Sequence, residues 1–445
     1  MLATLGNKAE AERFEATEHE DIADNVKLPY YGLGDGPKLE NANEKVIKFG
    51  CFAEAQNLDV RLFLTFAQII ALAGDFFGVS SQPITNEDET QLGNITEERR
   101  GRFIEAYNTI AQWSNNFLVE HSFKTDLMNC LDTIRKERKK IEKVAGQKVE
   151  KNGVIGYHDN RDLINGVYEK HSYKLFKEAD RKSGGYWIGP IPKRFGRLLS
   201  LCETNYDHFQ PYAKVAFEVG LELAFKEAVK ARSKNTPNEK NHVLDNAYSI
   251  LAFACHFLTD AFSSGHIRTP RRELPNETPR SKTGHLLTNK MHDEDNKYGL
   301  RVTSQVAQNE EPENASWIAY GDKMLQHTLN GRNLKYARRA VQQAADEVFA
   351  ASKNESQGWE AAISNSKVFN FIPEIDASDS SKNNTPMFQT RPDGKICRRK
   401  NLRDLQCKEP MMENWNGEKT LAQLKMYKPR NFVNHSRREE MENDE

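Results

Sequence analysis

Apolar residues recur at helical spacing in several long stretches of the chain, whereas alternating, strand-like runs are rare. This pattern predicts an all-α protein built from many helices. No internal repeat is visible along the sequence. The predicted helices cover residues 60–74, 99–119, 122–143, 206–231, 243–262, 317–330 and 333–352.

Three stretches interrupt this helical pattern. Residues 1–50 mix acids with a Gly/Pro run, residues 152–197 are rich in Gly, Tyr and Asp, and residues 352–417 are rich in Ser, Asn, Asp and Pro. We expect long irregular insertions there, the last of them a mobile surface segment. The pattern therefore predicts a helical domain over 1–350 and a polar, loop-rich extension with an acidic tail over 351–445.

The longest apolar run, residues 62–79, has about the length of a bilayer span, but it carries Gln68 and Asp75. We interpret it as a buried helix, so no transmembrane segment is expected. The first residues contain many acids and no basic start before an apolar stretch, which argues against a signal peptide. The six cysteines contain no CxxC pair, which favours free thiols in a reducing compartment.

The overall charge of the chain argues against a nucleic-acid partner. The 445 residues include 63 Lys and Arg against 64 Asp and Glu, a net charge of -1, so there is no basic excess. The one basic run, residues 135–151, interleaves its charges with Glu and continues a helical pattern. We favour a solvated helix face there over a phosphate or membrane patch.

The strongest chemical signal lies on the apolar stretch 243–262. His256 and Asp260 are four residues apart, so a helix places them on one face. Alone, such a pair is more often a hydrogen-bonded core pair. After a Ser-Ser-Gly breaker, however, His266 completes the pattern H-x3-D-x5-H. Because a buried imidazole beside a carboxylate needs a partner, three such residues favour a metal site.

Further candidate ligands flank this pattern. His285 and His292 follow it, and three acids, Asp293 to Asp295, come directly after His292. Asp207 and His208 precede it at the start of another predicted helix, and Asp75 ends the buried helix at 62–74. Zinc accepts a mixture of imidazole and carboxylate, whereas calcium and magnesium avoid imidazole, so zinc is the expected metal.

These residues resemble a known family. The run HFLTDAFSSGH is similar to the core of the zinc-dependent phospholipase C superfamily, which includes the single-strand-specific zinc nucleases. With TFAQIIALAGDFFG before it and MHDEDNKYGL after it, the sequence resembles the phosphatidylcholine-hydrolysing zinc metallophospholipases C of pseudomonads and intracellular pathogens. The resemblance covers roughly residues 15–350 and implies an all-α, multi-helix zinc phospholipase C-like bundle that holds two or three zinc ions.

The resemblance also implies the ligands. Asp260 would bridge two ions, and His19 would serve the ion that the compact family members hold partly with their N-terminal amino group. The family places a glutamate four residues after its last histidine; here that residue is Asn296, and Asp295 is the nearest acid. The implied metal ligands are His19, Asp75, His208, His256, Asp260, His266, His292 and Asp295.

The implied reaction is hydrolysis of a phosphodiester by a metal-activated water, which for phosphatidylcholine gives diacylglycerol and phosphocholine. Asp75 is the candidate general base, and Arg268 or Arg271 could neutralise the phosphoryl group. A choline headgroup favours an aromatic wall, for which Tyr186 and Trp187 are the preferred candidates over Tyr206. The partner would be a phospholipid at a membrane surface.

Two other functions stay open at this point: a zinc nuclease or nucleotidase that uses the same cluster, and a non-catalytic helical binding protein whose His–Asp pairs hold its core. We expect synthesis in the bacterial cytoplasm without a signal peptide. The resembling branch includes effectors injected into host cells, and the acidic end REEMENDE resembles C-terminal signals of type IV secretion, so export into a host cell is the accompanying hypothesis.

Overall fold

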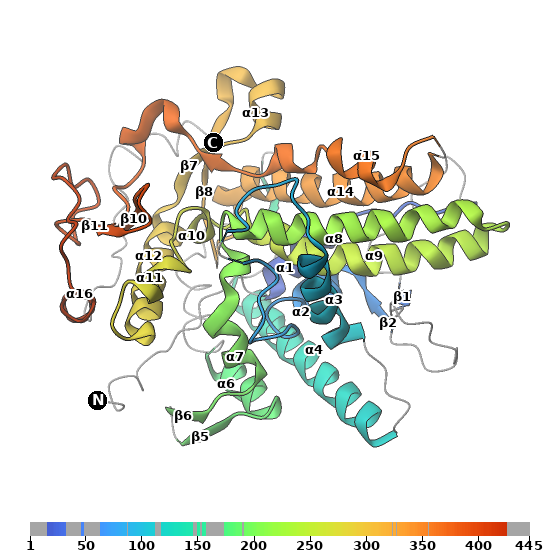
Figure 1. Ribbon diagram of the computed structural model, residues 1–445, viewed down its shortest axis with the longest axis horizontal. Coiled ribbons are helices and arrows are strands. Elements are labelled where there is room, and N and C mark those ends of the chain that lie inside the picture. The colour runs from blue at the N-terminus through green and yellow to red at the C-terminus, as the bar shows by residue number, and fades with distance from the viewer. Residues whose placement is uncertain are drawn as a thin grey trace.

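Helices dominate the described part of the chain, and its strands are short (Figure 1). The computed structural model describes residues 16–32, 46–48, 63–86, 88–111, 117–145, 149–151, 154–156, 173–188, 191–322, 324–325, 327–354 and 356–424. The prediction of a mostly helical protein is confirmed.

The helices are α1 (Ala16–Ala23), α2 (Phe66–Leu72), α3 (Glu97–Ala111), α4 (Phe117–Ala145), α6 (Tyr173–Lys182), α7 (Arg197–Thr204), α8 (Tyr212–Ala228), α9 (Pro237–Asp260), α10 (Ser264–Ile267), α11 (Glu273–Asn276), α12 (Ser281–Tyr298), α13 (Gln305–Glu310), α14 (Gly331–Lys353), α15 (Trp359–Ser364) and α16 (Gly417–Leu424). One short 3-10 helix matters for the site: η3 (Asn205–His208).

The strands form small antiparallel sheets. Four are two-stranded, and one has three strands in the order β8-β7-β9. The strands are β1 (Val46–Lys48), β2 (Phe63–Thr65), β3 (Val149–Lys151), β4 (Val154–Gly156), β5 (Tyr186–Ile188), β6 (Ile191–Arg194), β7 (Leu300–Thr303), β8 (Ser316–Ala319), β9 (Glu374–Ile375), β10 (Phe388–Thr390) and β11 (Ile396–Arg398).

Helices α8 and α9 pack side by side at the centre, and α14 lies along both (Figure 1). From Val243 onward α9 is buried almost all round, apart from the partly exposed Asn246, because α1, α2, α8 and α14 cover its different faces. Gly220 allows the closest approach, since a Cβ there would lie 2.4 Å from the Cβ of Ala254 and 2.5 Å from Phe103. Helix α9 is apolar nearly all round because it lies at the centre of the helical core.

The predicted helices correspond to α2, α3, α4, α8, α9 and α14, with shifted ends. Helix α9 begins at Pro237 instead of 243, because Thr236 and Glu239 form a capping box ahead of the apolar part. The helix predicted over 317–330 is wrong. Its first residues form β8, where Trp317 and Ala319 alternate inward, and β8 pairs with β7.

The segment expected to be a mobile extension contains a second, smaller core. This core joins α11 and α12 to residues 387–424, and its buried members are Leu274, Leu287, Met291, Met387, Phe388, Ile396, Leu402 and Leu424. Beside it, the fully buried Arg399 donates to both carboxylate oxygens of Glu294 on α12, at 2.7 and 2.8 Å. The C-terminal segment therefore braces α12 from outside.

The longest apolar run, predicted as one buried helix over 62–79, is helical only in α2, which is buried along nearly its whole length; Phe63–Thr65 form β2, and the chain turns after Leu72. Among the described residues, no helix combines the length and apolar character needed to cross a membrane. Residues 1–15, with the N-terminal amino group that compact family members use as a ligand, and the acidic tail interpreted as an export signal both lie outside the described residues.

Replacing Arg399 by Met should lower the free energy of unfolding by about 3 kcal/mol or more, because Glu294 would keep a buried charge without its partner. Lys400→Met is the matched control: Lys400 pairs with Glu409 where both side chains are about half exposed, so its loss should cost less than about 0.5 kcal/mol. Urea unfolding of both variants measures the difference. Equal midpoints would mean that the buried pair does not stabilise this region.

Candidate metal centre

The centre begins at the end of α9, which carries His256 and Asp260 on one buried face. The chain leaves the helix at Ala261 and re-enters a short helix, α10, that presents His266. Ser263 lies in the connecting turn and donates its hydroxyl to Asp322, with oxygens 2.8 Å apart. The H-x3-D-x5-H pattern is therefore folded back on itself so that all three of its side chains face one interior.

Asp75, His208 and His256 form a first group of ligand atoms within 4.8 Å of one another. Asp75 follows Gly74 after α2, and His208 ends η3. Nε2 of His256 lies 3.1 Å from Nδ1 of His208. Gly74 adopts φ +66°, and a Cβ there would lie 2.5 Å from Cδ2 of His256. Only glycine fits this conformation and this approach together.

His19, His256 and Asp260 form a second group, which brings α1 against α9. Nδ1 of His256 lies 2.9 Å from the carbonyl oxygen of Ile70, which can only accept, so Nδ1 carries the proton. Nδ1 of His19 lies 2.7 Å from Oγ1 of Thr259, whose own proton points to the carbonyls of Cys255 and His256. Both histidines therefore turn an unprotonated Nε2 toward Asp260.

His266, His292 and Asp322 form a third group. Nε2 of His292, on α12, lies 3.0 Å from Oδ2 of Asp322, in the turn after β8. Asn296, four residues after His292, accepts the backbone N–H of Gly265 at 2.6 Å and directs its amide to the His292 ring. Asn296 thus joins the α10 turn to α12, and the carboxylate of this group comes from Asp322.

Asp295, the acid that the sequence analysis placed here, points elsewhere. Its two carboxylate oxygens accept Nε and Nη2 of Arg268 at 2.9 and 2.6 Å. Nη1 of Arg268 donates to the carbonyl of Asn384, so the C-terminal segment completes this contact. The structure brings seven of the eight predicted ligands together, leaves Asp295 in an ion pair, and adds Asp322.

Asp260 lies between the three groups. Its Oδ2 is 2.7 Å from Nδ1 of His208 and 3.4 Å from Nε2 of His256, and its Oδ1 is 3.3 Å from Nδ1 of His266 and 3.7 Å from Nε2 of His19. Two ligand atoms on one tetrahedral metal ion, each about 2.0–2.1 Å from it, lie about 3.3 Å apart. The separations from His266, His256 and His19 are close to that value, whereas the 2.7 Å to His208 is a hydrogen-bond distance.

The protonation states also fit a cation. Burial lowers the pKa of His19 well below its usual value and, less strongly, that of His256, so both rings stay neutral. Burial alone would raise the pKa of Asp260, but the neighbouring His208 and His256 outweigh it and hold that pKa far below the usual range. Asp322 behaves similarly, its pKa falling to about 2 beside His292. Neutral imidazole and ionised carboxylate are the forms that bind metal.

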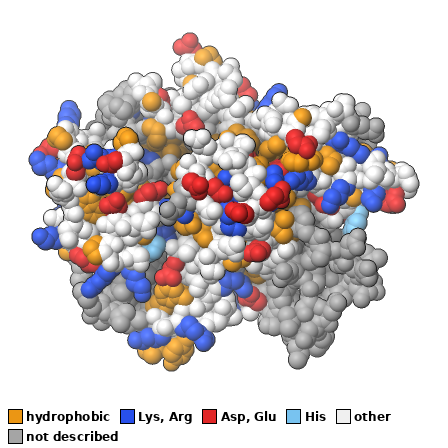
Figure 2. Space-filling view, in the orientation of Figure 1, with side chains coloured by type: hydrophobic (Ala, Val, Ile, Leu, Met, Phe, Trp, Pro, Cys, Tyr) orange, Lys and Arg blue, Asp and Glu red, His pale blue; other side chains and the backbone are white. Residues whose placement is uncertain are grey.

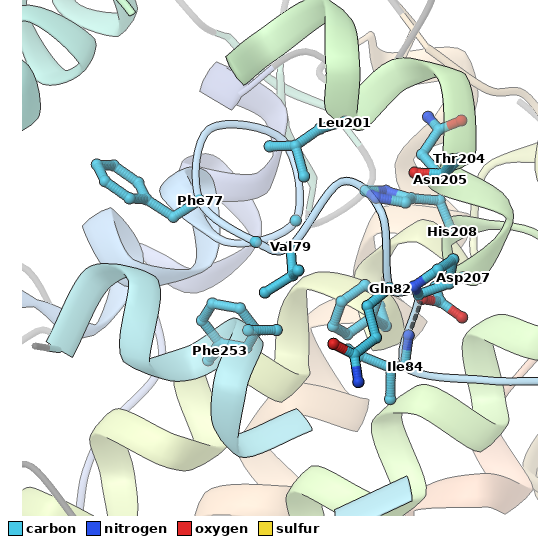
Figure 3. Close-up of a pocket in the computed structure, with 15 residues that line it drawn as sticks. Phe77, Val79, Gln82, Ile84, Leu201, Thr204, Asn205, Asp207, His208 and Phe253 are labelled. Carbon is cyan, nitrogen blue, oxygen red and sulfur yellow. Dashed lines mark hydrogen bonds between the residues drawn. The ribbon is translucent and has the colours of Figure 1, made fainter. Parts of the chain in front are cut away.

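A small pocket opens beside the first group (Figure 3). Gly74 and His208 line it, together with Asn205 and Asp207. In Figure 3 the labelled polar residues gather on one side, whereas Phe77, Val79, Leu201 and Phe253 form an apolar wall on the other. Asp207 itself accepts the backbone N–H groups of Ile84 and Thr85, at 2.6 and 3.1 Å, and so holds the loop over the pocket.

Arg271, a predicted substrate contact, does not line this pocket but holds a residue that does, Asn205. Its guanidinium donates to Oδ1 of Asn205 from Nε and Nη2 at 3.1 and 3.0 Å, and Nη1 lies 2.6 Å from Nδ1 of His285. Burial, followed by the charge of Arg271, lowers the pKa of His285 to about 4. His285 therefore contacts Arg271 and belongs to none of the three groups.

The aromatic residues predicted to form a wall for a choline headgroup lie in different surroundings. Trp187 is buried and donates its indole N–H to Asp180 at 2.8 Å, whereas Tyr186 is 56% exposed on β5. Tyr206 stacks under Arg272, whose guanidinium carbon lies 4.2 Å from the ring centroid. None of these three aromatics lines the pocket beside His208.

The residue that sequence reasoning missed is Asp322. It lies 30 positions after His292 and carries no spacing signal, and the stretch around it was interpreted as a helix. Asn296 did occupy the expected i+4 position on α12. Comparisons of the chain with family models, with curated proteins and with solved structures found no match. What this centre does is therefore inferred from its own geometry.

Gly74→Ala should reduce the metal content of the protein, because the new methyl group would intrude between His256 and His208. Gly93→Ala is the control: φ there is +89°, so the backbone strain is similar, but nothing lies within 4 Å of the added carbon. Zinc content by mass spectrometry after reconstitution compares the two. Equal retention of zinc would contradict a metal site beside Gly74.

Asp322→Asn should weaken the group formed with His266 and His292, so after reconstitution with zinc the variant should retain one ion fewer than the wild type. Asp295→Asn should keep the wild-type stoichiometry and unfold at lower urea, because it weakens only the pair with Arg268. Mass spectrometry and urea unfolding separate the two effects. Loss of zinc in Asp295→Asn alone would reverse this assignment.

Proposed function

We propose that this protein is a zinc-dependent phospholipase C with a phospholipase C-like helical bundle, which hydrolyses glycerophospholipids, phosphatidylcholine in particular, to diacylglycerol and a phosphorylated headgroup. One observation carries the proposal. Around Asp260, unprotonated ring nitrogens of His19 and His256 face carboxylate oxygens at 3.7 and 3.4 Å. Two acceptors cannot bond to each other, and burial opposes protonation of the rings, so a cation between them is what we propose. Nδ1 of His208, 3.1 Å from Nε2 of His256, is a further nitrogen of the same cluster.

Zinc suits this set of ligands, because it accepts imidazole and carboxylate together in tetrahedral sites. Two or three ions would be held by His19, Asp75, His208, His256, Asp260, His266, His292 and Asp322. When bound, zinc supplies charge that polarises a phosphoryl oxygen and lowers the pKa of a water.

The residues around the pocket support a phosphodiester with an apolar part. Asp75 belongs to the metal group nearest the pocket, and we assign it to accept the proton of the attacking water. The wall of Phe77, Val79 and Phe253 offers an apolar surface directly beside His208. A glycerophospholipid presents a phosphate next to apolar chains, whereas a nucleotide presents it next to a sugar and a polar base. This contrast favours the lipid over the nucleic acid.

The two arginines are proposed to act by position. All guanidinium nitrogens of Arg268 face protein oxygens, and its pair with Asp295 orients the segment after His266 against α12. Arg271 holds Asn205 at the pocket rim, where its positive charge lies close to an entering phosphodiester. We also propose that these two arginines contact the phosphoryl group of the substrate. We further propose that the protein acts at a phospholipid surface and that it is exported to a host cell.

His256→Ala should lose bound zinc and lose hydrolysis of phosphatidylcholine by at least about 100-fold, because His256 belongs to two of the three groups. His242→Ala is the control, since His242 is exposed on the same helix. Zinc content and phosphocholine release are measured on the same samples, with single-stranded DNA as a second substrate. Zinc binding with cleavage of DNA and not of lipid would replace the phospholipase by a nuclease; a wild type without zinc would leave a helical binding protein.

A further inference from the structure

The β5–β6 hairpin presents two large apolar side chains to the outside. Along β5 the exposure alternates: Tyr186 is 56% exposed, Trp187 is 5% exposed and Ile188 is 54% exposed. Among the described residues, Tyr186 and Ile188 are the two most exposed large hydrophobic side chains. They point to the same side of the strand, because they are two residues apart.

This hairpin has a rigid base. The indole N–H of Trp187 donates to Oδ2 of the fully buried Asp180 at 2.8 Å. Oδ1 of Asp180 accepts the backbone N–H of Leu199 on α7 at 3.1 Å, and its carbonyl accepts the N–H of Gly185 at 2.8 Å. One carboxylate thus ties α6, the hairpin and α7 together, so the exposed pair is presented from a fixed support.

Positive charge surrounds the exposed pair. Tyr186 pairs across the hairpin with Arg194, and the exposed Lys193 precedes it. The only exposed carboxylate among described residues 177–194 is Glu178, which pairs with Lys182 at 3.2 Å. In Figure 2 the end of the molecule where β5 and β6 lie shows hydrophobic surface between Lys and Arg side chains. The basic residues of this region are Lys177, Arg181, Lys182, Lys193 and Arg194.

The hairpin is connected directly to the metal centre. It leads into α7, which is eight residues or about 12 Å long, and then into η3 with His208. Arg197 at the start of α7 donates to the carbonyl of Phe76 and to Asp126 at 2.6 Å, and it stacks on Phe77 at 4.3 Å. These contacts hold the hairpin in a set position relative to the segment that carries Asp75.

We propose that the β5–β6 hairpin docks the protein on an anionic phospholipid surface, with Tyr186 and Ile188 entering the headgroup layer and the surrounding Lys and Arg residues contacting lipid phosphates. Tyr186 and Ile188 are apolar side chains surrounded by basic residues. This combination matches an anionic membrane interface, which offers an apolar interior beneath a negatively charged surface. Trp187 then serves as the internal anchor of the docking element. The inference deepens the proposed function, because it names how the enzyme would reach its lipid.

Vesicle flotation of the full chain tests the docking. One set of vesicles contains phosphatidylcholine alone, and the other contains phosphatidylcholine with about one-third phosphatidylserine, an anionic lipid. We expect the Tyr186→Ser/Ile188→Ser double variant to partition at least about 10-fold more weakly than the wild type onto anionic vesicles. Lys193→Glu/Arg194→Glu should lose the preference for phosphatidylserine. Leu92→Ser and Met128→Ser, at other exposed apolar positions, should bind as the wild type does.

Circular dichroism and zinc content establish that each variant is folded. Wild-type binding by the folded Tyr186→Ser/Ile188→Ser variant would overturn the proposal. So would a wild type that binds no vesicles, or one whose self-association in size-exclusion chromatography is what the double variant abolishes. Flotation does not require catalysis. Binding without any lipid hydrolysis would therefore leave the docking hairpin standing and remove the phospholipase proposal.

Discussion

The carboxylate of Asp260 is the constraint on which the centre depends. It lies in the interior of a helical core and within 3.7 Å of four histidine nitrogens. Two of these, Nε2 of His19 and Nε2 of His256, carry no proton, because Nδ1 of each ring faces Thr259 or Ile70. An ionised carboxylate without compensation is costly in such surroundings. The imidazole shell reduces that cost only in part: Nδ1 of His208 lies within hydrogen-bond distance, at 2.7 Å, whereas Nε2 of His19 and of His256 present lone pairs. A bound cation would compensate this negative charge.

The segments that supply the other ligands are held by polar contacts with partners distant in the sequence. Glu18 on α1 accepts the backbone N–H of Leu325, three residues after Asp322, at 2.9 Å. Asn296 joins α12 to the turn before His266, and Arg399 from the C-terminal segment secures Glu294 on that same helix. These contacts hold the segments that carry His19, His266, His292 and Asp322. Such support is typical of sites that must keep their geometry.

The surroundings of the centre differ from one side to the other. Toward α12 the ligands are packed against a second core and a buried ion pair, whereas toward η3 a pocket with an apolar wall reaches His208. The same η3 side continues through α7 to the hairpin with its exposed Tyr186. The exposed Tyr186 and the pocket residues Leu201 and His208 thus lie on one stretch of chain, whose first part, up to residue 197, the sequence pattern marks as irregular.

Local sequence determined what depends on helical periodicity. The spacing of His256, Asp260 and His266 was sufficient to predict one buried face with metal-binding character, because a helix fixes the relation of residues four apart. The mostly helical architecture followed from the same periodicity. Tertiary structure decided which carboxylate joins His292: Asp322 arrives from a turn after β8, and Asp295 is turned toward Arg268. It also turned Trp187 inward and Tyr186 outward. Those choices depend on packing between segments distant in the chain, which no short-range pattern records.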